Sequence, residues 1–259
     1  MARQKLRYCA NLGWLFPDLP FEQRFAAAAK AGFKGVEFSQ PYDHEISKLK
    51  ALLDDNDLEL VLFNLPAGDW AKGDRGMGCV PARQQEFRDG VKRALDYALA
   101  LGCKRVNCLA GIAPEDVARG ALWQTLAENL HFAAEAMARE NMTLVLEPIN
   151  RNDMPGFFLN TSEDAVKAIA ASGHPNIQLQ YDIYHMQRSE GELASTITRL
   201  LPMIGHMQLA DNPGRHQPGT GEINFQFLLN HIAGSGYDGW MGCEYAPLGK
   251  TEDTLGWMI

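Results

Sequence analysis

Four consecutive apolar segments in the second half of the chain carry an oxygen-bearing side chain at their carboxyl end. In chain order these are Glu147 after 143–146, Asp182 after 177–181, Gln208 within 203–210 and Glu244 after 240–243. A polar residue at the end of a buried parallel strand lowers stability unless it is bonded, so each is a candidate site residue. Carboxylate and amide oxygens favour Mg²⁺ or Mn²⁺, whereas zinc and copper prefer imidazole and thiolate. The pattern therefore predicts a site for Mg²⁺ or Mn²⁺, at which one ligand carboxylate can also act as a base.

Each of these residues also has a simpler interpretation. A single Glu or Asp at the end of a strand is commonly just solvated by the following loop. Gln208 could hydrogen-bond to a ligand residue instead of binding the metal. Four such residues on consecutive strands are harder to explain in this way, so we predict that they surround one ion.

Two further polar residues lie close to these candidates in the sequence. His185 comes three residues after Asp182 and faces the same side if a helical turn begins there. It would then donate a hydrogen bond to a substrate oxygen, or it is a loop histidine bonded to backbone. Arg215 lies in the polar loop after Gln208, where its planar guanidinium could bind a substrate carboxylate or remain an exposed charge. We predict that His185 and Arg215 bind substrate, and that Arg188 is solvated.

Segment 64–83 is a long glycine-rich stretch, and long loops inside compact domains are usually functional. Asn64 at its start and Trp70 within it are further substrate-binding candidates, although Trp70 could equally be a surface contact. His206 shares a strand face with Gln208 but lies one layer deeper, so we expect a hydrogen-bonded core histidine.

Alternating strands and helices must position these residues. Strands are predicted at 6–11, 35–38, 58–63, 105–109, 143–146, 177–181, 203–210 and 240–243, and helices at 21–31, 46–54, 84–101, 121–140, from 161, at 192–201, at 225–232 and briefly within 251–259. This alternation favours a closed (β/α)8 barrel, although a doubly wound open sheet has the same periodicity. In the barrel, the carboxyl ends of all strands meet at one face, where active sites lie. We therefore predict an α/β fold, a TIM barrel, with residues 1–259 as a single domain.

Composition limits the partners of the protein. A net charge of −8 argues against nucleic acid as the main partner. The five cysteines are scattered and form no CxxC pair, which fits reduced thiols in the cytoplasm better than a disulfide framework. No apolar run approaches the roughly 18 residues that span a bilayer, and the start of the chain does not resemble a signal peptide. We expect a cytoplasmic protein without a membrane partner; a homo-oligomer is compatible with the sequence, which does not determine the oligomeric state.

Several segments resemble the hydroxypyruvate isomerase family of the xylose isomerase-like TIM barrel superfamily. They extend over nearly the whole chain and are together highly specific: Asn64-Leu65-Pro66-Ala67-Gly68-Asp69-Trp70, Glu147-Pro148-Ile149-Asn150, Tyr181-Asp182-Ile183-Tyr184-His185-Met186-Gln187, Ala210-Asp211-Asn212-Pro213, Pro218-Gly219-Thr220-Gly221-Glu222-Ile223-Asn224 and Gly242-Cys243-Glu244-Tyr245. The resemblance implies a metal held by Glu147, Asp182, Gln208 and Glu244. It also implies that Glu147 and Glu244 are the catalytic pair that transfers protons.

The activity that this resemblance implies is that of an isomerase of glyoxylate metabolism acting on a small hydroxy-keto acid. It would interconvert hydroxypyruvate and tartronate semialdehyde through an ene-diolate. One glutamate would remove a proton from the hydroxymethyl carbon and the other would return one to the former ketone carbon. We assign removal to Glu147 and delivery to Glu244, an order that the sequence leaves open. The reaction is internally redox-neutral and the chain contains no GxGxxG motif or P-loop, so no nucleotide cofactor is expected.

Two positions depart from the usual family pattern and leave the substrate open. Phe63 stands where His is common, as it often does in 2-oxo-tetronate isomerases, and Gly13-Trp14 stands where Ser-Met is common. The alternatives are a 2-oxo-tetronate isomerase or a ketose 3-epimerase that uses the same site, and a sugar-acid binding protein without catalytic activity. A metal-dependent endonuclease would require more histidine ligands and a basic groove, which the net charge of −8 disfavours.

Overall fold

The computed structural model of the chain describes residues 5–258. Eight parallel strands form a closed barrel in which each strand pairs with its neighbours in sequence and β8 pairs with β1. The strands are β1 (Arg7–Asn11), β2 (Gly35–Glu37), β3 (Glu59–Asn64), β4 (Arg105–Cys108), β5 (Thr143–Leu146), β6 (Ile177–Asp182), β7 (Ile204–Leu209) and β8 (Trp240–Cys243). The closed barrel confirms the predicted (β/α)8 fold and excludes the open sheet.

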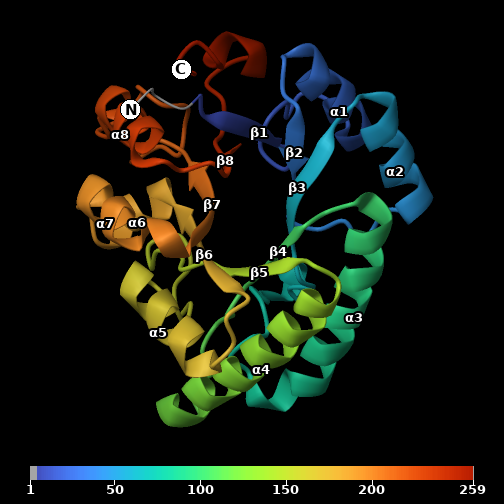
Figure 1. Cartoon of the computed structure of the whole chain (residues 1–259), viewed down its shortest axis with the longest axis vertical. Coiled ribbons are helices and arrows are strands. Elements are labelled where there is room, and N and C mark those ends of the chain that lie inside the picture. The colour runs from blue at the N-terminus through green and yellow to red at the C-terminus, as the bar shows by residue number, and fades with distance from the viewer. Residues whose placement is uncertain (1–4, 259) are drawn as a thin grey trace.

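Helices surround the barrel (Figure 1). They are α1 (Phe21–Lys30), α2 (Ile46–Asp55), α3 (Gln84–Leu101), α4 (Arg119–Arg139), α5 (Ser162–Ser172), α6 (Ile183–Ser189), α7 (Leu193–Leu200) and α8 (Phe225–Ser235). Short 3₁₀ helices occupy other connections: η1 (Trp70–Lys72), η2 (Pro81–Arg83), η3 (Leu201–Met203) and η4 (Thr251–Thr254). Within residues 5–258, none of these helices combines the length and the apolar character that crossing a membrane requires.

Local sequence signals set the ends of several helices. The bounds of α3 are those predicted, and the helix ends at Gly102, whose φ of 72° is left-handed and suits glycine. The Thr161 side chain accepts a hydrogen bond from the backbone N–H of Asp164 at 3.2 Å, so it caps the first turn of α5. The predicted start of this helix is therefore confirmed.

Helix α6 was not predicted from the sequence. The pattern indicated only that His185 would face the same side as Asp182 if a helical turn began there. Helix α6 begins directly after β6, because Asp182 ends the strand and also caps the helix. Asp182 Oδ1 accepts the backbone N–H groups of Tyr184 at 2.8 Å and His185 at 3.3 Å. A helical turn therefore does start there, and His185 lies on it next to Asp182.

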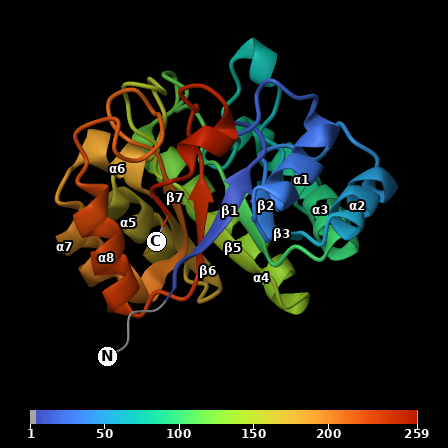
Figure 2. The ribbon, with the colours of Figure 1, turned by 90° about the horizontal axis from the view of Figure 1, so that it is seen from above.

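Polar side chains fill part of the barrel interior. The carboxyl ends of the strands and the loops that follow them lie at one end of the barrel, at the top in Figure 2. Seven polar strand residues are at most 3% exposed: Asn11, Glu37, Asn107, Gln180, Asp182, His206 and Gln208. Because burial of a polar group without a partner is unfavourable, these residues must bond to one another or to a ligand.

Candidate active site

Three carboxylates lie together at the carboxyl ends of β5, β6 and β8. Glu147 is 5% exposed and Asp182 1% exposed, and the side chain of Glu244 is 12% exposed. Potential ligand atoms of Glu147, Asp182 and His185 all lie within 4.8 Å of one another. Arg215 Nη2 joins the third carboxylate to them, since it lies 3.2 Å from Glu244 Oε2 and 3.8 Å from Asp182 Oδ2. The structure thus brings five of the predicted site residues into one cluster.

In each carboxylate a protein donor holds one oxygen. Asn107 Nδ2 donates to Glu147 Oε2 at 2.9 Å, and Trp14 Nε1 donates to Glu244 Oε1 at 3.1 Å. Asp182 Oδ1 accepts the first N–H groups of α6, as described above. The second oxygen of each carboxylate makes the contacts within the cluster. These oxygens are Glu147 Oε1, Asp182 Oδ2 and Glu244 Oε2. Such outer hydrogen bonds orient the ligands of metal sites.

The proximity of the carboxylates makes their joint ionisation unfavourable. Burial raises the pKa of Glu147 well above its ordinary value, and the charges of Glu244 and Asp182 raise it further. Burial also raises the pKa of Glu244 to about 8, although the charge of Arg215 opposes this shift. A cation among these oxygens would favour the ionised forms. The donor set and its electrostatics therefore fit Mg²⁺ or Mn²⁺.

Gln208 reaches the same interior, but its amide is bonded on both sides. Its Nε2 donates to Glu37 Oε1 at 2.7 Å, and its Oε1 accepts from Gln180 Nε2 at 2.6 Å. A carbonyl oxygen has two lone pairs, so Oε1 still has one acceptor position for a cation. The role of Gln208 as a fourth ligand stays a prediction.

Hydrogen bonds define the tautomer of His185. Asn150 Oδ1 accepts two backbone N–H groups of the following turn, both at 3.0 Å, so its Nδ2 must face His185 Nδ1 at 2.7 Å. Nδ1 is therefore the acceptor, and Nε2 carries the proton 3.6 Å from Asp182 Oδ2 and 4.0 Å from Glu147 Oε1. Burial lowers the pKa of His185 to about 4. At neutral pH this residue is a neutral imidazole with an N–H directed at the cluster.

The guanidinium of Arg215 lies between two aromatic rings, with Cζ 4.5 Å from the ring centre of Trp14 and 4.9 Å from that of Tyr184. Burial lowers its pKa, but the charges of Glu244 and Asp182 outweigh this and raise it above the ordinary value. Its buried Nε has no hydrogen-bond partner among the described residues. Arg215 is thus a cation held in place by two rings, and its Nε–H group is still available to donate to a ligand.

Arg188 is not solvated, so the prediction for this residue is wrong. Its side chain is 20% exposed, and Nη1 donates to Tyr184 Oη at 3.2 Å and to the carbonyl oxygen of Pro213 at 3.3 Å. Its position on α6 turns it toward the loop after β7. Tyr184 lies one helical turn away on α6, but Pro213 is 25 residues away in sequence, and the local pattern could not predict that contact.

The two candidates from the long third loop have different surroundings. Asn64 Oδ1 accepts from Asn107 Nδ2 at 3.1 Å, and that amide also holds Glu147, so Asn64 adjoins the cluster. Trp70 is 47% exposed and packs against Arg75, whose Cζ lies 4.0 Å from the ring centre. Trp70 lines a separate cavity of about 540 Å³. Glu147, Asp182 and Glu244 are not among the residues that line this cavity. Both substrate-binding roles stay predictions.

Glu37, at the end of β2, is a buried carboxylate that the sequence analysis missed. Its Oε1 accepts Gln208 Nε2 at 2.7 Å and Asn11 Nδ2 at 3.0 Å, and its Oε2 lies 2.7 Å from His206 Nε2. Burial favours a higher pKa for Glu37, but the charge of His206 and these hydrogen bonds lower it below the ordinary value. His206 is thus the bonded core histidine that was expected. Glu37 ends its strand as the other candidates do, so the same pattern, applied to the first half of the chain, would have found it.

Gly242 on β8 leaves the space that Glu37 occupies. A Cβ atom at this position would lie 2.3 Å from Glu37 Oε1. We expect Gly242→Ala to lower the free energy of unfolding by about 1–3 kcal/mol, as overpacking of a core does. Urea unfolding measures this change.

The matched control is Gly234→Ala in α8, an exposed position where a Cβ would meet no heavy atom within 4 Å. This variant should be as stable as the original protein or more stable by up to about 1 kcal/mol, because alanine favours helix. If both alanine variants had the stability of the original protein, the placement of Glu37 beside Gly242 would be contradicted.

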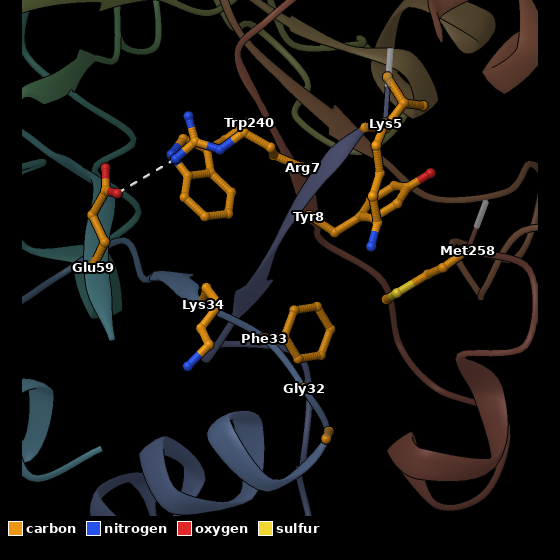
Figure 3. A pocket seen from close by; sticks show the side chains of 11 residues that line it. Lys5, Arg7, Tyr8, Gly32, Phe33, Lys34, Glu59, Trp240 and Met258 are labelled. Carbon is orange, nitrogen blue, oxygen red and sulfur yellow. Dashed lines mark ion pairs between the residues drawn. The ribbon is translucent and has the colours of Figure 1, made fainter. Parts of the chain in front are cut away.

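A cavity of about 710 Å³ lies at the other end of the barrel, at the amino ends of β1, β3 and β8 (Figure 3). There Arg7 stacks on Trp240, with Cζ 3.9 Å from the ring centre, and pairs with Glu59 at 3.6 Å. Glu59 is the one carboxylate among the described residues that line it. Because active sites of TIM barrels lie at the carboxyl ends of the strands, we assign the site to the carboxylate cluster instead.

Comparisons with known proteins agree with this architecture over nearly the whole chain. The family model described as xylose isomerase-like TIM barrel matches residues 25–259. Hydroxypyruvate isomerase of Escherichia coli (strain K12) is 52% identical over 253 residues, which are 98% of each chain. The 2-oxo-tetronate isomerase of Cupriavidus necator is 44% identical over 252 residues, which are 97% of each chain.

A solved structure extends this similarity to three dimensions. The crystal structure described as AP endonuclease, family 2 from Brucella melitensis has a TM-score of 0.95 and 43% identity to this chain, and covers 97% of both chains. The chain therefore belongs to the xylose isomerase-like TIM barrel family and, within it, to the hydroxypyruvate isomerase family of isomerases.

Proposed function

We propose that the protein is a metal-dependent isomerase that interconverts hydroxypyruvate and tartronate semialdehyde. The observation that carries this proposal is the cluster of Glu147, Asp182 and Glu244, in which protein donors hold one oxygen of each carboxylate. The E. coli relative that is 52% identical over almost its full length is a hydroxypyruvate isomerase. Glu147, Asp182 and Glu244, with Gln208 as fourth ligand, would hold Mg²⁺ or Mn²⁺. A divalent cation there would polarise the substrate carbonyl and stabilise negative charge on its oxygen.

Glu147 and Glu244 would then transfer the protons between carbon atoms. Glu147 takes a proton from the hydroxymethyl carbon of hydroxypyruvate, which leaves an ene-diolate, and Glu244 returns a proton to the former ketone carbon. The proton of the hydroxymethyl oxygen moves to the neighbouring oxygen, so the reaction is redox-neutral. Burial raises the pKa of both carboxyl groups in the metal-free protein, and a bound cation would favour the ionised form that a base needs to accept the proton.

His185 and Arg215 would bind the substrate beside this pair. His185 Nε2 has its proton directed at the cluster, so it can donate to the substrate oxygen whose charge changes. Arg215 has a buried Nε without a partner among the described residues, and this donor would bind the substrate carboxylate. Asn64 would close the site on the side of Asn107, and Trp70, in the loop after β3, would contact the substrate from that side.

The proposed carboxylate contact predicts a binding defect in Arg215→Lys. A lysine cannot present the planar fork, and a hydrogen bond to a charged group contributes about 1.5–3 kcal/mol. We expect the KM for hydroxypyruvate to rise roughly tenfold or more. Arg188→Lys is the matched control: both arginines pack on the Tyr184 ring and lie within 4.0 Å of Asp153, but among the described residues only Arg215 also pairs with Asp182 and Glu244. A KM that rises equally in both variants would contradict the specific role of Arg215.

A second candidate is a 2-oxo-tetronate isomerase, which would use the same residues on a substrate longer by one carbon. The relative of that name is 44% identical. Phe63, one of the two positions that depart from the usual family pattern, is fully buried in β3 directly before Asn64. Rates with hydroxypyruvate, 2-oxo-tetronate and five- or six-carbon ketoses separate these possibilities and the 3-epimerase. A binding protein without activity would bind one of them without turnover.

Proton NMR of hydroxypyruvate in D₂O tests the proposed function. With enzyme and Mg²⁺, deuterium should enter the hydroxymethyl carbon, and signals of tartronate semialdehyde should appear. Samples with chelator, and samples without enzyme, give the background of spontaneous exchange. Exchange at the background rate with Mg²⁺ or Mn²⁺ present would refute the proposal.

The cysteines support a cytoplasmic location as part of this proposal. All five, Cys9, Cys79, Cys103, Cys108 and Cys243, are buried and free. Reduced thiols are typical of the cytoplasm, whereas oxidising compartments favour disulfides.

A further inference from the structure

Glu37 links three strands of the barrel beneath the carboxylate cluster. It extends from β2 and bonds to Asn11 on β1 and to His206 and Gln208 on β7. The backbone of Gly242 on β8 makes the space for it. The carboxylate is only 1% exposed, so its position depends on these neighbours rather than on solvent.

The chemistry of a carboxylate determines which way the Gln208 amide points. An ionised carboxylate only accepts hydrogen bonds, so the side of the amide that faces Glu37 must be the NH₂ group. The amide oxygen is therefore directed away from Glu37. It faces β6, where Gln180 donates to it and where Asp182 is the register partner of Gln208.

We propose that Glu37 is a positioning residue that keeps the oxygen of Gln208, rather than its nitrogen, available to the cation. This inference rests on the proposed function, because it assumes that a divalent cation binds the carboxylate cluster. His206 contributes by bonding to the second oxygen of Glu37, which restrains rotation of the carboxylate. An amide nitrogen cannot bind a cation, so a reversed Gln208 would remove one ligand.

Stability alone does not explain this arrangement. Desolvation of the buried Glu37 carboxylate is unfavourable, and well-packed apolar residues in place of a buried charge and its partner are often at least as stabilising. The barrel interior holds Glu37 and His206 where apolar side chains would fill the same layer. Orientation of Gln208, the residue directly above, explains why the charged Glu37 is present in this layer.

A metal site on Glu37 itself is the competing interpretation. Cys9, Glu37 and His206 have potential ligand atoms within 4.8 Å of one another. However, hydrogen bonds from Asn11 and Gln208 already occupy Glu37 Oε1, and Oε2 lies 2.7 Å from His206 Nε2. That spacing is a hydrogen bond, and it leaves no room for an ion between the two groups.

The test is the dissociation constant of Mn²⁺, measured by electron paramagnetic resonance on the protein, Glu37→Gln, Gln208→Ala and the double variant. Loss of an outer hydrogen bond weakens metal binding roughly 10- to 100-fold, so we expect this change in Glu37→Gln. If Glu37 acts through Gln208, adding Glu37→Gln to Gln208→Ala should weaken binding less than about twofold further. Cys9→Ser, which alters only a 3.4 Å contact to the same carboxylate, should bind Mn²⁺ as the original protein does.

The outcomes separate this inference from the proposed function. Unchanged Mn²⁺ affinity in Glu37→Gln would overturn the inference and leave the function standing. Losses that multiply in the double variant would also overturn it, because a lost charge would then act without Gln208. Absence of Mn²⁺ binding to the original protein would overturn both. If Glu37→Gln does not fold, Glu37→Asp serves instead, since it keeps the charge but withdraws the carboxylate from Gln208, and it should weaken Mn²⁺ binding in the same way.

Discussion

Replacement of Glu147 or Glu244 by Gln is expected to lower turnover at least about 10²-fold, the smaller effect seen when a general acid or base is lost. Glutamine has nearly the same size, but its amide neither accepts a proton from carbon nor delivers one. Both carboxyl groups have raised pKa values in the metal-free protein, mainly because they are buried. Steady-state kinetics with hydroxypyruvate and saturating Mg²⁺ measures the effect.

The matched control is Glu140→Gln, an exposed glutamate that caps the end of α4 just before β5. It should retain the turnover of the original protein. Near-normal turnover in both Glu147→Gln and Glu244→Gln would contradict the acid–base pair.

The two variants should also differ from each other if the proposed order of proton transfer is correct. Glu147→Gln should lose exchange of the hydroxymethyl protons with D₂O. Glu244→Gln should keep this exchange, since Glu147 still removes the proton, but should form almost no tartronate semialdehyde. The opposite result would show that Glu244 removes the proton and Glu147 delivers it, and would leave the acid–base pair itself unchallenged.

Removal of the divalent cation is expected to reduce isomerisation to the uncatalysed background. The substrate carbonyl would then face three acidic groups with one compensating cation, Arg215, 3.2 Å from Glu244. Dialysis against a chelator followed by addition of Mg²⁺ or Mn²⁺ should abolish and then restore activity. Full activity after exhaustive chelation would exclude the role of the metal.

Removal of the divalent cation should also change how the stability of the protein depends on pH. Burial raises the pKa of Glu244 to about 8 in the folded, metal-free protein, against about 4.3 in an unfolded chain. Between these values the folded state binds more protons than the unfolded state, so the free energy of unfolding falls as pH rises, by at most roughly 1.4 kcal/mol per unit from Glu244 alone. Urea unfolding between pH 5 and pH 8 should show this decline, and saturating Mg²⁺ should diminish it. An equal decline with and without Mg²⁺ would contradict the cation site.

The positions of the site carboxylates followed from the sequence because a parallel barrel converts strand ends into one surface. Glu147, Asp182 and Glu244 each follow or end an apolar segment, and barrel closure brings β5, β6 and β8 to the same rim. Helix α3 was predicted to the residue, because an amphipathic pattern and Gly102 define it locally. Local signals therefore suffice where neighbours in sequence determine the structure.

Other features depend on partners that are distant in sequence. Glu37 contacts His206 and Gln208, which are 169 and 171 residues away, and no local pattern pairs them. Trp14, just after β1, donates to Glu244 across 230 residues, beside the place where β1 pairs with β8. Arg188 was expected in solvent for the same reason. Hydrogen-bond direction in Gln208 and the tautomer of His185 likewise required the folded arrangement.

The central claim is that side chains at the ends of β5, β6, β7 and β8 bind one cation. Anomalous diffraction from a crystal soaked in Mn²⁺ tests it most directly. We expect a single strong peak within coordination distance of Glu147, Asp182 and Glu244, with Gln208 Oε1 as the fourth protein ligand. No peak there, or a peak between Cys9, Glu37 and His206 instead, would contradict it.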